Sequence, residues 1–169
     1  PNPVYDTTGE SISITYVDAT KGWIPTNDGA VADEVPQIYT VEWLCLAGGG
    51  SSGCENAGGG GAGGYRLKYA SENSGGGTNT ESTLTFNGGT VYTITVGAGG
   101  ATQSSSSQRG NVGIDSSIAG SDITDITSAG GGGGGAAGAT SSAGKAGGDG
   151  GSGGGAAEYS GAASGGSGT

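Results

Sequence analysis

Hydrophobic and polar residues alternate with a period of two in several short stretches of the chain. Near the N-terminus, Ile12, Ile14 and Tyr16 alternate with serine and threonine, which predicts a half-buried β-strand. Trp23–Pro25 follows a glycine turn and indicates the start or edge of a partner strand. Residues 26–37 are polar, so we interpret them as a linker.

The apolar stretch Val41–Ala47 differs because both of its faces are hydrophobic. In a strand, Trp43 and Cys45 would lie on one face and Leu44 and Leu46 on the other. A strand that is apolar on both faces is typically covered on both sides. We therefore expect this strand to lie inside the fold rather than at its edge.

A β-hairpin is predicted farther along the chain. Leu84 and Phe86 alternate with threonine, and the turn Asn87–Gly89 leads into a second alternating stretch, Thr90–Val96. Ile123–Thr127 indicates a weaker strand. No window of about 12 residues combines a 3.6-residue period with helix-forming residues, so no α-helix of normal length is expected.

Glycine accounts for 43 of the 169 residues, and only three glycines precede Ala47. Three predicted strands run directly into glycine, at residues 46–48, 96–98 and 128–130. This composition is typical of flexible low-complexity chains, but a junction repeated in this way indicates an ordered architecture. Ordering so much glycine costs conformational entropy, which other interactions must offset.

The glycine tracts fit a helix with three residues per turn. In polyproline II geometry every third residue lies on the same face, and the backbone forms no hydrogen bonds within the helix. Between Gly144 and Gly155, one column carries side chains, among them Asp149 and Ser152, which we expect to face water. The other two columns are glycine apart from one lysine: Gly144, Gly147, Gly150 and Gly153, then Gly148, Gly151 and Gly154. Two bare faces allow neighbouring helices to approach and to bond through their backbones.

Gly58–Gly64 and Gly130–Gly138 fit the same geometry. Only five Val, Ile, Leu or Phe residues lie between Gly97 and Thr169, too few for a side-chain core. Hydrogen bonds between helices, at about 1 kcal/mol net each, would have to stabilise this region. The predicted fold class is all-β, with a polyglycine-II helix bundle framed by β-strands. Collagen is excluded because no Gly-X-Y register is sustained.

The sequence offers little chemistry. There is no histidine, and Cys45 and Cys54 are the only cysteines, so one chain cannot supply a Cys₄ or Cys₂His₂ zinc site. These two thiols could be free or could form a disulfide. Gly138–Ala146 and Gly97–Thr102 approach nucleotide-binding loops, but the first lacks a hydroxyl residue after its lysine and the second lacks a third glycine. We predict no enzyme activity, no cofactor and no metal.

The net charge of the chain limits the kinds of partner that it can bind. Five Lys and Arg against fifteen Asp and Glu give a net charge of −10, which repels nucleic acid and anionic lipid surfaces. No apolar run reaches the roughly 18 residues of a membrane helix. Asp115, Asp122 and Asp125 are interpreted as turn residues rather than catalytic groups. Neither nucleic-acid binding nor membrane insertion is expected.

Four motifs occur in a fixed order: "VEWLCLAGGG", "GGGGAGGY", "YTITVGAGG" and "ITSAGGGGGGAAG". Together they resemble the glycine-rich domain that is widespread in bacteriophage tail fibres and related surface proteins, and the resemblance extends from about Thr40 to the C-terminus. The segment "ESISITYVDATKGWIP" resembles the closing hairpin of small β-modules that precede such domains. The resemblance implies a division into residues 1–38, the end of a β-module plus linker, and residues 39–169, a polyglycine-II domain.

The resemblance also implies a function. It points to a tail-fibre or receptor-binding protein of the virion surface, whose glycine-rich distal domain contacts a host cell-surface glycan or outer-membrane protein. Other fibre proteins are implied as partners, and so is a homotrimer, in which Ile12, Ile14, Tyr16 and Trp23 would meet symmetry mates or a preceding module. The family usually ends in an apolar closing strand, which we expect to follow Thr169 or to come from elsewhere.

Adhesin contacts are expected in polar loops, and Ser71–Thr80 and Thr102–Asn111 are the candidates. Their hydrogen-bonding side chains are Asn73, Asn79, Gln103, Gln108, Arg109 and Asn111. A purely structural subunit of a fibre shaft or extracellular filament is the alternative, and it would need apolar surfaces at both ends. An ice-binding protein is a remote alternative, because no threonine ladder lines the outward column.

Overall fold

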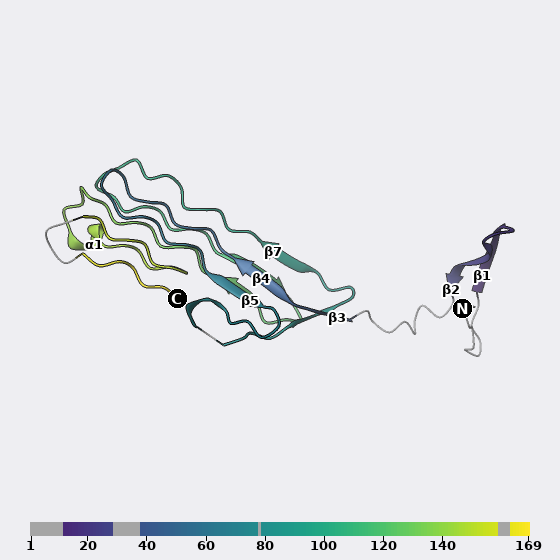
Figure 1. Ribbon diagram of the computed structural model, residues 1–169. Coiled ribbons are helices and arrows are strands. Elements are labelled where there is room, and N and C mark those ends of the chain that lie inside the picture. The colour runs from purple at the N-terminus through teal and green to yellow at the C-terminus, as the bar shows by residue number, and fades with distance from the viewer. Residues whose placement is uncertain (1–11, 29–37, 78, 159–162) are drawn as a thin grey trace. The chain divides into compact units, whose positions relative to one another are not determined.

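The computed structural model describes these parts of the chain: residues 12–28, 38–77, 79–158 and 163–169 (Figure 1). Contacts between residues divide the chain into two units, Pro1–Gln37 and Ile38–Thr169, and each unit is described by itself. None of the helices in the described parts has the length and hydropathy needed to span a bilayer.

The first unit contains an antiparallel hairpin of β1 (Ile12–Asp18) and β2 (Gly22–Asp28). The Asp18 carboxylate accepts hydrogen bonds from the amides of the two residues that follow Ala19, over 2.8 and 2.7 Å, and holds the turn. Gly22 closes it with φ of 68°, a conformation that favours glycine. The predicted strand pair is confirmed, and β2 extends into the predicted linker, whose residues 29–37 lie outside the described part.

The second unit contains three small antiparallel sheets. Their strands are β3 (Ile38–Val41) with β6 (Leu84–Asn87), β4 (Trp43–Leu46) with β5 (Tyr65–Lys68), and β7 (Tyr92–Thr95), β8 (Ser116–Gly120) and β9 (Ile126–Ser128) in that order. The described helices are one four-residue turn, α1 (Ser142–Lys145), and a short 3₁₀ piece, η2 (Gly75–Gly77). The fold is therefore all-β without a helix of normal length in the described residues, as predicted.

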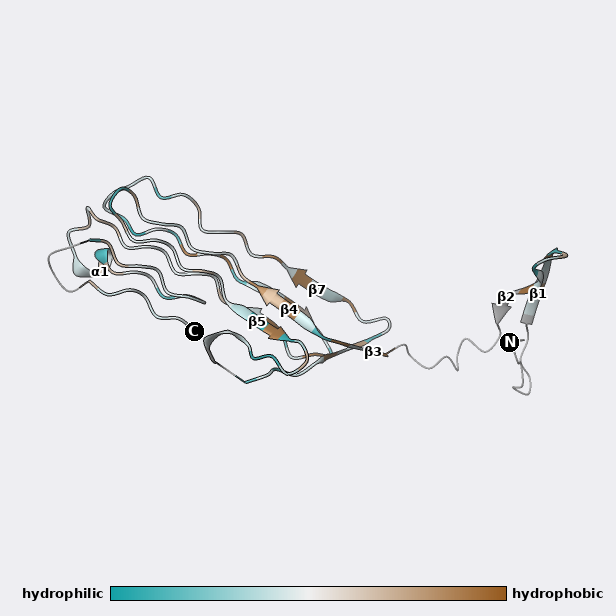
Figure 2. Ribbon diagram, in the orientation of Figure 1, coloured by the Kyte–Doolittle hydropathy of each residue, from teal (hydrophilic) through white to brown (hydrophobic). Residues whose placement is uncertain are grey.

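The side-chain core lies where these sheets meet. Trp43 and Cys45 of β4 are buried with Ile118 of β8 and Ile126 of β9, and Leu84 of β6 completes the cluster. Figure 2 shows strongly hydrophobic positions on the strands, whereas the long glycine-rich segments have a pale, near-neutral colour. Large apolar side chains are thus concentrated at the strand end of the unit.

The prediction of one continuous interior strand from Val41 to Ala47 was wrong. The chain leaves one sheet and enters another at Glu42, so β3 and β4 have different partners. The inner face of β4 is buried, but Leu44 and Leu46 on the outer face are 55% and 52% exposed. Within this chain, β4 is covered on one side only.

The predicted hairpin between Leu84 and Val96 was also wrong. The turn exists, because the Thr90 amide donates to the Asn87 carbonyl and Gly89 has φ of 85°. Beyond the turn the strands separate: β6 pairs with β3, and β7 pairs with β8. Local alternation could not reveal these partners, because each strand pairs with a segment distant in sequence. The predicted strand Ile123–Thr127 forms only near its end, as β9.

A bundle of extended glycine-rich segments continues from the strands (Figure 1). Its centre is residues 129–136, of which residues 130–136 are all buried. This central segment exchanges backbone hydrogen bonds with five neighbouring segments: residues 48–51, 58–64, 110–113, 148–151 and 152–155. A buried backbone surrounded by other backbones is the packing that the two bare columns predict.

Hydrogen bonds recur every three residues in this bundle. The amides of Gly58, Gly61 and Gly64 donate to the carbonyls of residues 135, 132 and 129, over 2.7 to 2.9 Å. The amides of residues 110 and 113 donate to the carbonyls of residues 134 and 131 of the central segment. The amides of residues 148 and 151 donate to the carbonyls of residues 133 and 130 on another face. In each pair, the two accepting carbonyls are three residues apart. Three residues per turn is the period of polyglycine II. None of these glycines lies in the positive-φ region, which excludes the mirror-image helix.

The prediction of a single helix from Gly144 to Gly155 was wrong. Gly144 belongs to the turn α1, and the chain bends at residues 151–152 and runs back, so that the amide of Gly154 donates to the carbonyl of Gly148. Two short antiparallel segments replace one long one. Asp149 is exposed, yet its carboxylate also accepts the Ser167 amide over 2.6 Å, so it holds the following segment as well as facing water.

Close backbone contact explains why the bundle uses glycine. On five of the seven column glycines, a Cβ would lie within 2.3 Å of another segment's backbone: Gly147, Gly150, Gly151, Gly153 and Gly154. On Gly148 the nearest atom would be 3.2 Å away, and on Gly144 it would be the Ala139 side chain. Side chains are excluded at the first five positions by backbone rather than by movable neighbours.

Candidate functional site

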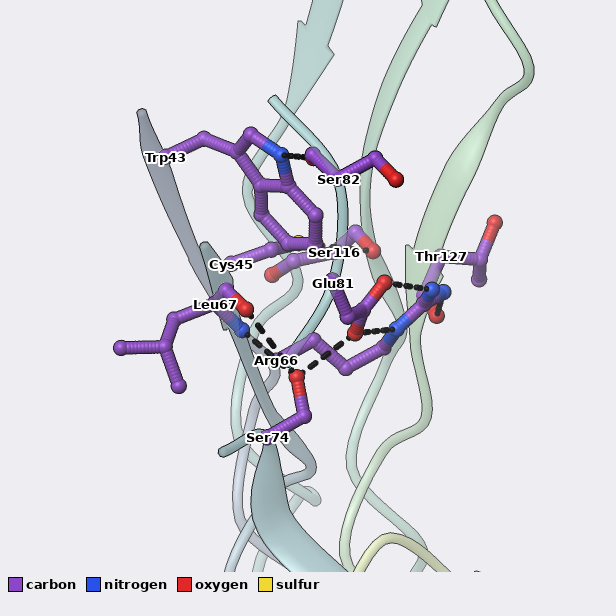
Figure 3. A network of polar contacts seen from close by, with 9 residues as sticks. All are labelled: Trp43, Cys45, Arg66, Leu67, Ser74, Glu81, Ser82, Ser116 and Thr127. Atoms are coloured by element: carbon purple, nitrogen blue, oxygen red, sulfur yellow. Dashed lines mark hydrogen bonds and ion pairs between the residues drawn. The ribbon is translucent and has the colours of Figure 1, made fainter. Parts of the chain in front are cut away.

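A polar network joins β5 to the loop that follows it, at the strand end of the second unit (Figure 3). The guanidinium of Arg66 on β5 donates to both carboxylate oxygens of Glu81, over 2.9 Å from Nε and 2.5 Å from Nη2. Its Nη1 donates to the backbone carbonyl of Thr127 on β9, over 2.9 Å. The two-pronged contact fixes the plane of the guanidinium and ties β5 to β9.

Ser74 anchors the other side of this network. Its hydroxyl oxygen accepts the Leu67 amide over 3.0 Å, and its proton can reach Glu81 Oε1 at 2.6 Å or the Leu67 carbonyl at 3.2 Å. Ser74 is therefore bonded to the edge of β5 where a neighbouring strand would otherwise pair. Because Ser74 is buried and bonded to Leu67, the chain folds back against the sheet at this residue.

Charge and burial set the protonation of this pair. The hydrogen bond from Arg66 lowers the pKa of Glu81, against a smaller opposing effect of burial, and the hydroxyl of Ser74 lowers it further. The same hydrogen bond raises the pKa of Arg66. Both groups therefore remain ionised at neutral pH, and their charges balance locally.

A hollow of about 400 Å³ opens beside this ion pair. Its walls come from the start of β5, the end of β9, residues Ser74–Gly76, Asn79 and the bend at Gly151. Thr169 also lines it. A space of this size is within the range of small-molecule sites.

The surroundings of Cys45 disfavour a reactive thiolate. Burial raises the pKa of Cys45, whose thiol donates to the Ser116 carbonyl over 3.4 Å, so the protonated form is favoured. Cys45 and Cys54 are free, which answers the question of a disulfide. Within the described residues no cluster of three His, Cys, Asp or Glu side chains could hold a metal ion.

The acidic residues singled out in the sequence stabilise turns. Asp122 accepts hydrogen bonds from the side chains of Asn87, Thr90 and Tyr92 over 2.7 to 3.1 Å, and these bonds lower its pKa. Asp115 accepts the amide of Gly130 over 2.8 Å, at the point where β9 becomes the central glycine segment. Both carboxylates are occupied by backbone or turn groups.

The loop Thr102–Asn111 lies at the opposite end of the bundle, beside α1 (Figure 1). Its carbonyl at Ser106 accepts the Gly138 amide, and the Arg109 guanidinium donates to the Ala143 carbonyl. Loops from separate segments therefore meet at this end, which we call the tip.

Several predicted contact residues already have partners at the tip. Gln103 donates to the Arg109 carbonyl over 3.1 Å, and Asn111 donates to the Ala101 carbonyl over 2.9 Å. Gln108 is exposed. Of the four candidates in this loop, Gln108 is the one whose side chain is most available to a partner.

The other two candidates, Asn73 and Asn79, are not at the tip. Asn73 accepts a hydrogen bond from Thr80 over 3.3 Å, and Asn79 is exposed at the hollow near β5. The structure does not bring the two candidate loops together. Arg66, Ser74 and Glu81 were missed by the sequence analysis. The scarcity of basic residues, only five in the chain, was the signal that could have drawn attention to Arg66.

Comparison with known protein families identifies a glycine-rich domain in this chain. The family model of the glycine-rich domain matches residues 26–169, and the chain belongs to this family. No curated protein and no solved structure matches the chain.

Proposed function

We propose that this chain is part of a virion fibre and that its glycine-rich unit is the distal domain that contacts the host surface. Membership of the glycine-rich family supports the domain assignment, and the resemblance to tail-fibre proteins supplies the setting. The partners would be a host cell-surface glycan or outer-membrane protein and other fibre proteins. The site of action would be the virion surface, with an extracellular location as the alternative.

The tip is the observation on which this proposal depends. Backbone hydrogen bonds in several directions make the bundle a stiff support, and the tip loops are polar and poor in charge, with serine, threonine and glutamine between residues 102 and 108. Hydroxyl and amide groups on a rigid support suit recognition of glycan or protein surfaces. The stiffness places the loops, and the loops provide the contacts.

A homotrimer is part of the proposal. Ile14, Tyr16 and Trp23 of the first unit are at least half exposed in the single chain, and the rings of Tyr16 and Trp23 lie edge to face at 5.4 Å. An isolated two-stranded hairpin is marginally stable in water. Contact with symmetry mates or with a preceding module would cover these side chains.

A purely structural subunit of a fibre shaft or filament is the second candidate. The exposed Leu44 and Leu46 on β4 favour it, because repeated subunits join through apolar surfaces. The hydrogen bonds already made by Gln103 and Asn111 also favour it.

Adsorption to host cells separates these candidates. A particle carrying Ser104→Ala with Gln108→Ala changes two exposed tip residues and leaves the anchoring Arg109 and Asn111 intact. We expect adsorption to fall about tenfold, corresponding to the loss of about 1.4 kcal/mol of contact energy. The matched control, Thr83→Ala with Thr124→Ala, changes exposed residues near the strands and should adsorb normally. Normal adsorption of both particles would favour the structural candidate.

A further inference from the structure

The hollow beside Arg66 and Glu81 has the properties of a small binding site. It is lined by two strand ends, a folded loop and glycine backbone, so its walls are fixed by the hydrogen bonds described above. Glycines 63, 64 and 151 are among its lining residues, so part of the wall is bare backbone. A preformed hollow of about 400 Å³ has room for one ring-sized ligand with some of its substituents.

Unused hydrogen-bonding groups converge on this hollow. Arg66 has five N–H donors, of which three have partners among the described residues, so two remain for a ligand. Asn79 presents an exposed amide at the rim, with both a donor and an acceptor. Glu81 retains acceptor capacity on its outer oxygen beyond the Arg66 contact.

Ser128 gives an independent indication. It is 1% exposed, lines the hollow and has a hydroxyl that makes no hydrogen bond in the structure. A buried hydroxyl without a partner costs free energy, and such groups are rare in folded proteins. A ligand or its bound water that reaches this hydroxyl would remove the cost.

The electrostatics of the hollow favour a neutral ligand. Arg66 is neutralised by Glu81, so neither an anion nor a cation finds an unpaired opposite charge there. The net charge of −10 further disfavours an anion.

We propose that this hollow binds a neutral sugar ring. Sugar hydroxyls both donate and accept hydrogen bonds, as do the amide of Asn79 and the hydroxyl of Ser128, while the guanidinium of Arg66 donates and the carboxylate of Glu81 accepts. This site goes beyond the proposed function of the tip loops, because it lies at the other end of the bundle and can be tested without a virion.

A titration with methyl glycosides of glucose, galactose, mannose and N-acetylglucosamine tests the inference. Backbone amide signals of the complete chain are followed by NMR, with each glycoside raised to about 50 mM, about tenfold above a weak dissociation constant of about 5 mM. We expect at least one glycoside to give saturable shifts at Gly75, Gly76 and Ser152, while tip signals such as Gly138 stay constant. Absence of saturable shifts for all four, or shifts confined to the tip, would overturn the proposal.

Two variants and a matched control locate the binding. Ser152→Trp places a ring in the hollow and should abolish the shifts, whereas Ser104→Trp places the same ring on an exposed tip residue and should leave them unchanged. Asn79→Ala removes one amide from the rim and should weaken binding by about fivefold to tenfold. If Ser152→Trp does not fold, the affinity of Asn79→Ala decides whether the glycoside binds in the hollow. Unchanged affinity in Asn79→Ala, or saturable binding of an extended glycine peptide but of no glycoside, contradicts the sugar assignment.

Discussion

The strand end and the glycine bundle of the second unit are stabilised in opposite ways. At the strand end, Trp43 and Ile118 belong to one buried hydrophobic cluster. The backbone hydrogen bonds of the strands there are formed within small sheets. In the bundle, the central segment is buried although most of its residues are glycine. Its backbone forms hydrogen bonds with five neighbouring segments. One region excludes water with side chains, and the other excludes it with backbone.

This difference predicts opposite sensitivities to mutation. Removing atoms from the strand end leaves a cavity, whereas adding even one carbon to the bundle creates a clash with a main-chain atom that cannot rotate away. The bundle therefore tolerates no side chain at its contact positions, while the strand end requires large ones. Substitutions that add atoms to the bundle and substitutions that remove atoms from the strand end therefore test whether the two regions are stabilised in different ways.

The largest expected effect is an added methyl group inside the bundle. In Gly132→Ala, the new Cβ would lie 1.9 Å from the carbonyl oxygen of Gly148. We expect a loss of more than about 4 kcal/mol in the free energy of unfolding, or failure to fold, because the clash must separate two hydrogen-bonded segments. Urea denaturation followed by circular dichroism measures the change.

Gly59→Ala is the matched control, since no atom lies within 4 Å of its Cβ position. It should be neutral or slightly stabilising, by up to about 1 kcal/mol, because alanine restricts the unfolded chain more than glycine does. Equal destabilisation by both substitutions would show that flexibility, rather than contact, explains the glycines.

The next effect is a deletion at the strand end. Trp43→Ala should lower the free energy of unfolding by about 3–5 kcal/mol, because it empties the core and leaves the Ser82 carbonyl without the indole donor at 3.0 Å. Leu44→Ala on the same strand is the control, and it should cost less than about 1 kcal/mol because this side chain is 55% exposed. Denaturant titrations of the two variants in parallel check the contrast, and similar losses would place the core on both faces of β4.

The fold class could be predicted from sequence because two periods were visible. A period of two found the N-terminal hairpin, and a period of three in the glycine tracts matched the spacing of hydrogen bonds. Strand partners could not be predicted, since β5 is short and polar in sequence and β8 is mostly small residues. The bend at residues 151–152 was missed because glycine permits both continuation and reversal.

The candidate site was harder to predict than the fold. Loop composition singled out Gln103 and Asn111, but polarity does not reveal that their side chains bond to their own loop and neighbouring backbone. The hollow depends on Arg66 and Glu81, which meet only after β5 and its following loop fold back. Contacts between residues 15 apart in a loop leave no periodic signal.

The smallest expected effect is the pH dependence of this ion pair. Arg66 holds the pKa of Glu81 below its usual range in the folded chain, so the contribution to stability is present above the unfolded pKa of about 4.3 and is lost as pH falls through the lower folded pKa. At pH 7, Glu81→Gln should lower the free energy of unfolding by about 1–2 kcal/mol, because it removes a charged hydrogen bond from a half-exposed guanidinium. Unfolding free energies measured from pH 7 to about pH 2.5 should converge for the two proteins at the acid end. Glu72→Gln removes an exposed carboxylate without an ion pair among the described residues and should track the wild-type protein throughout. A constant gap between wild type and Glu81→Gln over the whole range would mean that shape, rather than charge, holds β5 to β9.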